Sequence, residues 1–431
     1  MFNSDRIQKL LFKTYETEGK IMNIICERDI LNKAVTPASA AVSTKGTMQA
    51  LDGFLLIADK EEGTLVICGY DLEKGVKVTV SGEGVQINES GKIVLNAAKF
   101  SSIVRNLDGD ISIEVDSSFA AHIKSNRSEF TLNGLDADTF PLMPELTGER
   151  NLSISRKMLK NMISSTLFSV GVNSSTPALN GTLFEIKDNC LSVVASDGFR
   201  LSMTKSFEDF EELKVADESE SGLDLKFVIP GKSLAELIKL IGDEEENAEI
   251  QLTGKHVIVS FDNIIFFSRL IESDFLDYRR VITQVQPKTM AIVDTKSFVD
   301  SVERAAILTD DKGKTEIRLL FKKEELTLES REESGIVQVT STGTLGKVVD
   351  ECDMDIYGDD LLIAFNHRYL HEALRAVKDE KIVIKLESAM KSLIILPYDE
   401  ENGNNNNSNI DSLDIDNSKF LYLVLPLRMR D

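Results

Sequence analysis

The sequence predicts an α+β fold of three repeated domains, each with two helices packed on mainly antiparallel sheets. Three segments that begin at Asn96, Pro230 and Asn366 carry apolar residues at offsets 4, 7, 8 and 11, which is one face of a helix. Each segment follows a short apolar run that is typical of a strand, and the starts lie 134 and 136 residues apart. This regular spacing indicates an internal repeat.

A second helix is expected to open each repeat, so the sequence predicts helices at 27–38, 96–107, 155–170, 231–242, 295–308 and 366–378. Between the helices, apolar runs alternate with turn residues, as in Leu55–Ala58 and Thr64–Gly69. Runs that follow one another directly favour hairpins and antiparallel sheets. The last strand is expected over Phe420–Leu427, where Pro426 favours a sheet edge.

The repeat also predicts the domain organisation. We expect an extension at 1–21 that is either disordered or not translated, followed by domains at 22–147, 148–284 and 285–431. The last domain contains a polar insertion at 401–417, whose four consecutive asparagines are typical of a disordered segment.

Composition excludes several classes of protein. The 431 residues are 42% hydrophobic and 28% charged, which is ordinary for soluble cores. No apolar run approaches the roughly 20 residues that span a bilayer, so no membrane association is predicted. The first 21 residues lack an apolar signal core. Four scattered cysteines argue against a disulfide framework and favour the cytoplasm, and no cofactor is predicted.

Charge is distributed unevenly between the predicted helices and the rest of the chain. The net charge is −22, yet the six helices hold 14 Lys and Arg against 6 Asp and Glu. A basic helix surface on an acidic body suits a polyanion held by its backbone, although basic helices also serve solubility. The cations expected on these solvent faces are Lys99, Arg105, Lys157, Lys160, Lys232, Lys239, Arg368 and Arg375.

Motifs for catalysis are weak. Tyr357–Asp360 matches a short metal-binding hairpin of some polymerases, but its carboxylates lead straight into a strand, which favours a solvated turn. His367 and His371 have metal-compatible spacing without a third ligand nearby. We therefore predict no catalytic and no metal site. Two alternatives stay open at this point: a repeat scaffold that binds only proteins, and a phosphoryl-transfer enzyme built on Asp359 and Asp360.

Seven segments, in this order and spacing, resemble the bacterial sliding clamp family, the beta subunit of DNA polymerase III. They are Leu179–Glu185, Val194–Leu201, Phe227–Pro230, Asp277–Arg279, Arg304–Leu308, Ile363–Leu370 and Tyr422–Arg428. The resemblance spans roughly Met22 to Arg428. It implies the DNA clamp fold, with two chains joined head to tail into a ring that encircles double-stranded DNA as a non-catalytic processivity factor. The implied partners are the polymerase III catalytic subunit, the clamp loader, other repair and replication proteins, and a second copy.

The resemblance also implies site residues. A peptide-binding groove between the second and third domains matches Leu179, Ser196, Gly198, Phe199, Arg200, Leu201, Pro230, Leu234, Ser392, Leu423, Val424, Leu425, Pro426, Leu427 and Arg428. The ring interface matches Phe130, Ile307 and Leu308, and positions near DNA match Lys45, Lys99 and Arg105. Phe199 replaces a histidine common in the family, which makes a more apolar rim expected there.

Overall fold

The computed structural model describes residues 20–43, 48–144, 150–187, 190–206, 225–309, 316–324, 333–343, 346–398, 413 and 417–429. The predicted extension up to residue 19, Lys45 and nearly all of the insertion at 401–417 lie outside these residues. The chain divides into two compact units. The first takes residues 1–160, 210–220 and 232–270, and the second takes 161–209, 221–231 and 271–431.

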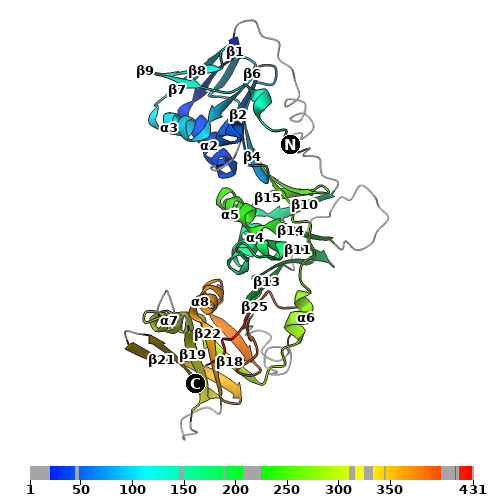
Figure 1. Cartoon of the computed structure of the whole chain (residues 1–431), viewed down its shortest axis with the longest axis vertical. Coiled ribbons are helices and arrows are strands. Elements are labelled where there is room, and N and C mark those ends of the chain that lie inside the picture. Colours follow the sequence, from blue (N-terminus) through cyan, green and yellow to red (C-terminus); the bar gives the residue numbers. More distant parts are fainter. Residues whose placement is uncertain are drawn as a thin grey trace, which may run out of the picture. The chain divides into compact units, whose positions relative to one another are not determined.

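The threefold repeat is confirmed by six helices that each follow directly on a strand (Figure 1). Asn96, Asp294 and Asn366 end three of these strands and accept hydrogen bonds from backbone N–H groups of the first helical turn. The pairs are β1 Lys20–Glu27 with α2 Arg28–Ala38, β6 Gly91–Asn96 with α3 Ala97–Asn106, β10 Arg150–Ser155 with α4 Arg156–Ser164, β14 Leu225–Pro230 with α5 Gly231–Leu240, β18 Thr289–Asp294 with α7 Thr295–Ala306, and β22 Leu361–Asn366 with α8 His367–Arg375.

The first unit contains two antiparallel sheets. Their strand orders are β5-β1-β7-β8-β9 and β10-β15-β16-β17-β4-β3-β2-β6. Helices α2 and α3 pack side by side, and α2 also contacts β3, β4 and β1, so the apolar helix faces are buried. The remaining strands are β2 Gly53–Asp59, β3 Thr64–Tyr70, β4 Lys74–Ser81, β5 Val85–Glu89, β7 Asp110–Asp116, β8 Ala120–Ser125, β9 Ser128–Asn133, β15 Asn247–Leu252, β16 His256–Phe261 and β17 Ile264–Arg269.

The second unit contains one antiparallel sheet with the order β14-β11-β12-β13-β25-β24-β23-β18-β21-β20-β19-β22. Helices α7 and α8 pack together over one core cluster that includes Phe298 and Leu370, and α6 Tyr278–Thr283 packs on a second cluster. The remaining strands are β11 Gly181–Lys187, β12 Cys190–Ser196, β13 Arg200–Ser206, β19 Glu316–Lys323, β20 Ser334–Gly343, β21 Gly346–Gly358, β23 Lys381–Leu386, β24 Leu393–Pro397 and β25 Phe420–Val424.

Two element predictions were wrong. The helix expected over 155–170 ends at Ser164 and is followed by a short 3-10 helix at Leu167–Ser169. The Ser165 hydroxyl donates to the carbonyl of Asn161 at 2.7 Å, and the Thr166 hydroxyl donates to that of Met162 at 3.0 Å. Side chains therefore satisfy carbonyls of the last turn, which favours ending the helix there.

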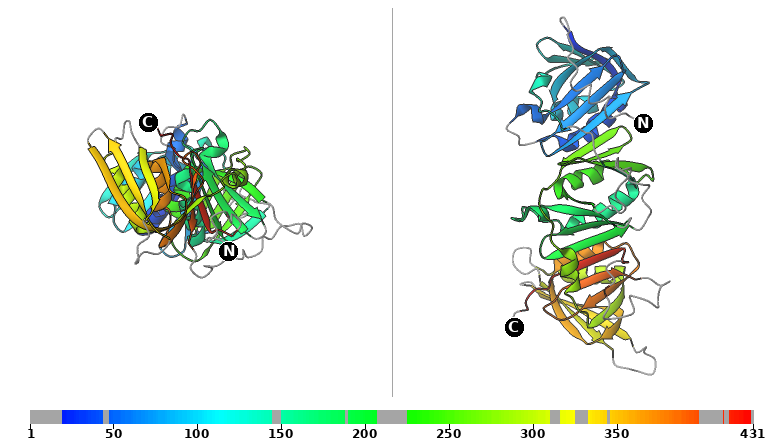
Figure 2. Two further views of the ribbon diagram at one scale, coloured as in Figure 1. Left: turned by 90° about the horizontal axis from the view of Figure 1, so that it is seen from below. Right: turned by 90° about the vertical axis from the view of Figure 1, so that its right-hand side faces the viewer.

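The C-terminal strand also differs from its prediction. It ends at Val424 rather than Leu427, and it lies between β13 and β24 instead of at an edge; in Figure 2 the red strand β25 lies between green and orange strands. Pro426 follows the last paired residue, so it removes no N–H from the sheet. Beyond it, the N–H of Leu427 donates to the carbonyl of Ala364 at 2.7 Å, outside β25. Within the described residues, no helix is long and apolar enough to cross a membrane.

Candidate functional site

The turn between β12 and β13 presents one aromatic side chain to solvent and one arginine to the interior. The Asp197 carboxylate accepts the N–H groups of Phe199 and Arg200 at 2.9 and 3.0 Å. Gly198 has φ +88°, which favours glycine, as expected for the predicted Asp-Gly turn. The Ser196 hydroxyl closes the turn by donating to the carbonyl of Arg200 at 2.8 Å. Phe199 is left 58% exposed, whereas Arg200 is buried.

Arg200 joins three separate segments of the second unit. Its Nε donates to Asp197 at 3.1 Å, and its two terminal nitrogens donate to the Glu372 carboxylate of α8 and to the carbonyl of Phe168. The guanidinium also lies 4.6 Å from the centre of the Tyr369 ring. Because the planar guanidinium donates in several directions, one buried side chain orients the turn against α8.

An exposed apolar patch lies beside this arginine. The rings of Phe199 and Tyr369 stack with centroids 6.0 Å apart. The N–H of Leu425, just past β25, donates to the carbonyl of Phe199 at 2.9 Å, and Leu425 is 40% exposed. Phe199, Tyr369 and Leu425 are hereafter called the aromatic patch. Its three members come from three segments far apart in the sequence, so the tertiary fold creates it.

The predicted groove residues are only partly gathered here. Pairing of β13 with β25 and of β25 with β24 brings together Ser196, Gly198, Phe199, Arg200, Leu201, Ser392, Leu423, Val424 and Leu425, and the chain continues through Pro426, Leu427 and Arg428. Leu201 and Leu423 are buried in one hydrophobic cluster, whereas Tyr369 packs against another. Leu179 and Pro230 flank β11, beyond β12 in the same sheet. Leu234 is fully buried in the first unit, so it is a core residue.

Helix α6 was missed by the sequence reasoning. Its Tyr278 hydroxyl donates to the buried Glu185 carboxylate, which also pairs with Lys226 at 2.8 Å. Burial alone would raise the pKa of Glu185, but the hydrogen bonds from Lys226 and Tyr278, together with the charges of Lys226 and Arg279, outweigh burial and lower it. Tyr278 belongs to the same hydrophobic cluster as Leu201 and Leu423. A possible signal was Asp277, whose side chain caps the helix.

The expected DNA-facing cations all lie on helices, apart from Lys45, which is outside the described residues. Lys99, Arg105, Lys232 and Arg368 are exposed. Four others have a carboxylate partner, which sequence reasoning did not anticipate. The pairs are Lys157–Glu245 at 3.3 Å, Lys160–Asp243 at 2.9 Å, Lys239–Glu236 at 2.9 Å and Arg375–Glu303 at 3.5 Å.

The residues expected at the ring interface lie near open sheet edges. In the first unit, Phe130 is 39% exposed on β9, the last strand of its sheet. In the second unit, Ile307 is 76% exposed just after α7. Leu308 follows it and packs its backbone against Gly343, where an added Cβ would lie only 2.1 Å from the Leu308 carbonyl oxygen. Ile307 therefore stands beside the β20–β21 hairpin.

The Tyr357–Asp360 segment, which matches a metal-binding hairpin in sequence, has a structural role. The Asp360 carboxylate accepts the N–H of Lys323 at 3.0 Å, and the Asp359 carbonyl accepts the Thr289 hydroxyl at 2.8 Å. His371 lies 2.7 Å from a Glu303 carboxylate oxygen. Over the part of the chain that the structure describes, no group of three or more potential metal ligands occurs.

Comparison with known proteins identifies the family. Models of the N-terminal, central and C-terminal domains of the DNA polymerase III beta subunit match residues 22–144, 153–277 and 279–407. The beta sliding clamp of Halalkalibacterium halodurans is 33% identical over 399 residues, which cover 90% of this chain and 99% of that protein. The chain belongs to the beta sliding clamp family.

Solved sliding clamps share the fold. The Bacillus subtilis clamp superimposes with a TM-score of 0.83 at 29% identity, covering 95% of this chain and 100% of that one. A Pseudomonas aeruginosa clamp, solved bound to griselimycin, gives 0.78 at 25% identity with the same coverage. This sliding clamp is a non-catalytic processivity factor that works with DNA and DNA polymerase. Family membership therefore excludes the enzyme alternative built on Asp359 and Asp360, and the scaffold that binds no DNA.

Proposed function

We propose that two copies of this clamp close head to tail into a ring around duplex DNA in the cytoplasm, and that partner proteins dock short peptides on the aromatic patch. The domains are those expected at 22–147, 148–284 and 285–431. The partners are the polymerase III catalytic subunit, the clamp loader, and other replication and repair proteins. A closed ring is retained by topology, so it holds a polymerase near DNA without gripping any base.

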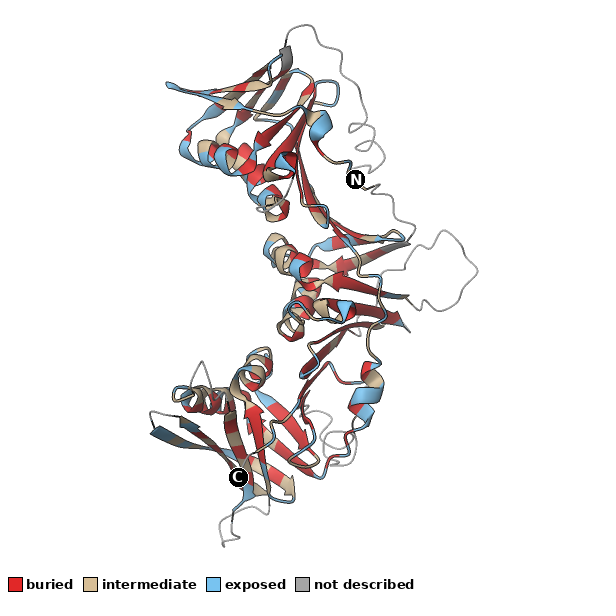
Figure 3. Ribbon diagram, viewed as in Figure 1, coloured by how far each residue is buried: buried red, intermediate tan, exposed pale blue. Residues whose placement is uncertain are grey.

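Two open sheet edges carry the ring proposal. Among the described strands, β9 pairs only with β8, and most residues of β9 are exposed. Within the described residues, positions 346–353 of β21 pair only with β20, because β18 pairs further along, at Asp355–Gly358. Figure 3 shows pale blue, exposed segments along both strands. The unpaired backbone groups of an open edge can hydrogen-bond to a strand of another chain. In the proposed ring, the β9 edge of one copy therefore pairs with the β21 edge of the other.

The aromatic patch supports the peptide-docking proposal. Exposed Phe199 and Leu425 offer apolar surface, and the hydrogen bonds around Asp197 and Arg200 hold it in place before a partner arrives. Preformed apolar surface with a few polar groups suits short peptides, because little conformational entropy is lost on binding.

Sedimentation equilibrium tests the ring. The native protein should sediment as a dimer. In the β8–β9 hairpin, Ser125 pairs with Ser128 across the turn, and His122 pairs with Thr131 three positions further along. Hydrogen-bonded and non-hydrogen-bonded pairs alternate along an antiparallel ladder, so the N–H of Thr131 points away from β8. Thr131→Pro should shift the mass toward the monomer, because it removes an N–H that the second copy would use. Thr131→Ala is the matched control and should stay dimeric. A dimer that tolerates proline as well as alanine would contradict pairing through β9.

A further inference from the structure

A turn of four consecutive acidic residues, Asp243–Glu246, follows α5 and lies against α4 in the first unit. Every Lys and Arg of α4 is engaged by this turn. The contacts are Lys160 with Asp243 at 2.9 Å, Lys157 with Glu245 at 3.3 Å, and Arg156 with Glu246 at 3.0 Å and with Glu244 at 3.6 Å. The helix that looks strongly basic in the sequence is therefore covered by opposite charge.

Arg156 holds the turn in position. It is 3% exposed, its backbone N–H donates to the carbonyl of Glu246 at 3.1 Å, and its guanidinium reaches Asp262 at 2.7 Å. The guanidinium also stacks 5.7 Å from the centre of the Phe261 ring. Only the arginine is buried, since its partners Glu244, Glu246 and Asp262 are 55%, 74% and 61% exposed. The backbone hydrogen bond and the buried guanidinium therefore hold the acidic turn beside α4 more firmly than contacts between exposed side chains would.

The contrast with α3 is plain. Lys99 and Arg105 are exposed on that helix, and within the described residues neither has an ion-pair partner. The carboxylates reaching Lys157 and Lys160 are themselves 85% and 81% exposed, so they stand where an incoming anion would meet these lysines. Two helices with similar sequence charge thus present different electrostatic surfaces.

We propose that the Asp243–Glu246 turn is a built-in competitor of DNA phosphates for Lys157 and Lys160. The inference rests on the proposed function, a ring around duplex DNA, and on the expectation that the basic helix faces, including that of α4, lie toward the DNA. A phosphate that contacts either lysine must displace a carboxylate, and the freed carboxylate then attracts a cation from solution. Fewer cations are released overall, so this part of the ring holds DNA weakly and lets it slide.

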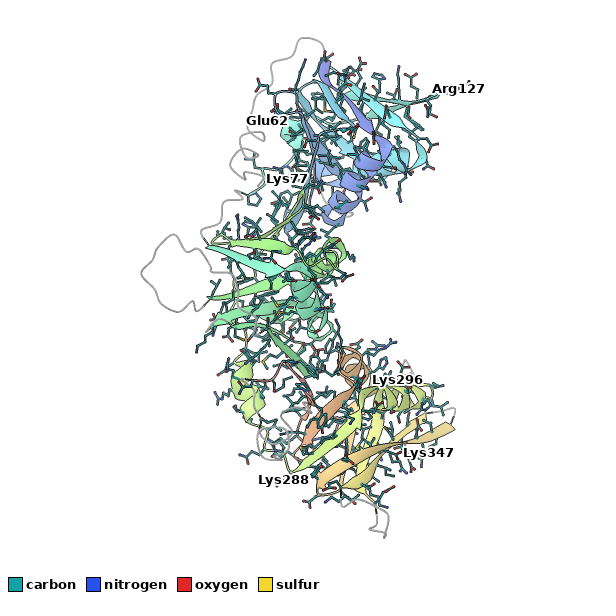
Figure 4. The ribbon with its side chains drawn as sticks, turned by 180° about the vertical axis from the view of Figure 1, so that it is seen from behind. Glu62, Lys77, Arg127, Lys288, Lys296 and Lys347 are labelled. Atoms are coloured by element: carbon teal, nitrogen blue, oxygen red, sulfur yellow. The ribbon has the colours of Figure 1, made fainter. Side chains whose placement is uncertain are left out.

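The test compares two variants that lose two negative charges each. Asp243→Asn with Glu245→Gln frees both lysines and leaves Glu244 and Glu246 on Arg156. Glu61→Gln with Glu62→Gln is the control, in an exposed turn whose backbone is held by Asp59; Figure 4 labels Glu62. Fluorescence anisotropy with a short duplex, at about 50 to 200 mM salt, measures affinity and its salt dependence.

The Asp243→Asn, Glu245→Gln variant (the acidic-turn variant) should bind roughly 2- to 25-fold more tightly than the control at the lowest salt, since each of the two exposed ion pairs is worth a factor of roughly 1.4 to 5. The slope of log affinity against log salt should steepen by up to about 2. Adding Lys157→Gln and Lys160→Gln should abolish the gain, whereas the same lysine changes in the native chain should cost little.

Equal affinity of the two charge variants would overturn the inference, as would a gain that survives loss of both lysines. Loader-dependent retention of the native protein on circular DNA is measured in parallel. If the native protein is retained and the acidic-turn variant binds DNA no more tightly than its control, the competitor proposal is contradicted, whereas the proposed clamp function is not. If the native protein is not retained, the proposed function itself is contradicted.

Discussion

The Arg200 guanidinium lies 4.6 Å from the centre of the Tyr369 ring and is paired with Glu372 one turn further along α8. The turn that presents Phe199 is thereby tied to a helix more than 160 residues away in sequence. Because Arg200 is buried, replacing its guanidinium with the single ammonium of a lysine leaves hydrogen-bond acceptors unpaired.

Arg200→Lys should destabilise the second unit by about 1–3 kcal/mol and weaken peptide binding, since the buried guanidinium makes hydrogen bonds that a lysine cannot replace. Thermal unfolding and a peptide titration measure the two effects. Arg368→Lys, at an exposed position on α8, is the control and should change neither. Equal unfolding temperatures and equal peptide affinities of the two variants would show that the Arg200 guanidinium does not hold the turn in place.

Leu425→Ala with Leu427→Ala should lose partner peptides and keep the ring. Leu425 is 40% exposed within the aromatic patch, so truncation removes docking surface without opening the core. Titration with a clamp-binding peptide of the polymerase III catalytic subunit measures the loss. Leu142→Ala, at an 81% exposed leucine of the first unit, is the matched control. Unchanged affinity of the double variant would refute the docking assignment.

Ile307→Ala with Leu308→Ala should open or dissociate the ring. Ile307 is 76% exposed in the single chain, and its burial against a second copy would contribute roughly a few kcal/mol. Sedimentation should show a mass shifted toward the monomer. Val172→Ala, at an 85% exposed apolar position, should stay dimeric. A native mass for the double alanine variant would count against this interface.

Tyr278→Phe should destabilise the native state by about 1–3 kcal/mol, because Glu185 loses a buried hydrogen-bond donor. The pKa of Glu185 is lowered in the fold, so its contribution is present above its ordinary pKa near 4.5 and is lost as pH falls through the lowered value. Unfolding at pH 7 and at pH 3 measures this. The difference between native and variant should shrink at the acidic pH; a constant difference would exclude the linkage.

Lys77 offers a stabilising substitution. It is 1% exposed on β4 opposite Cys68, and within the described residues its ammonium has no hydrogen-bond or ion-pair partner; Figure 4 labels it. Burial lowers the pKa of Lys77, so the unfolded chain binds more protons between that lowered pKa and about 10.4, and native stability rises with pH there.

Lys77→Met should raise the unfolding temperature and remove this rise, because an apolar side chain carries no charge to desolvate. Exposed Lys99→Met is the control and should have little effect. A lowered unfolding temperature for Lys77→Met would mean that the ammonium stabilises the native sheet.

Local patterns predicted the helices and many strands well, because helix faces repeat every few residues and caps such as Asn96 and Asn366 stand next to them. Pairings between segments that are distant in the sequence could not be predicted from these local patterns. Arg200 faces Val424 across β13 and β25, so the interior place of the last strand depends on residues more than 200 positions apart. Helix α6 has six residues, too few for a periodic signal.

The site was predictable to a similar extent. The Asp-Gly turn and the apolar C-terminus could be recognised along the chain, but the aromatic patch that joins Phe199 to Tyr369 needs the tertiary fold. The same holds for the pairing of Lys157 with Glu245, 88 residues away, because sequence charge counts do not reveal which surface faces which.

Retention on DNA tests the central proposal most directly. The native protein is loaded onto nicked circular plasmid by a clamp loader, gel-filtered in high salt, and the plasmid is then linearised. A closed ring should stay on the circle in salt and be lost from the linear form, because only topology resists salt. Loss from both forms, with loader activity confirmed, would contradict the ring and leave only electrostatic binding.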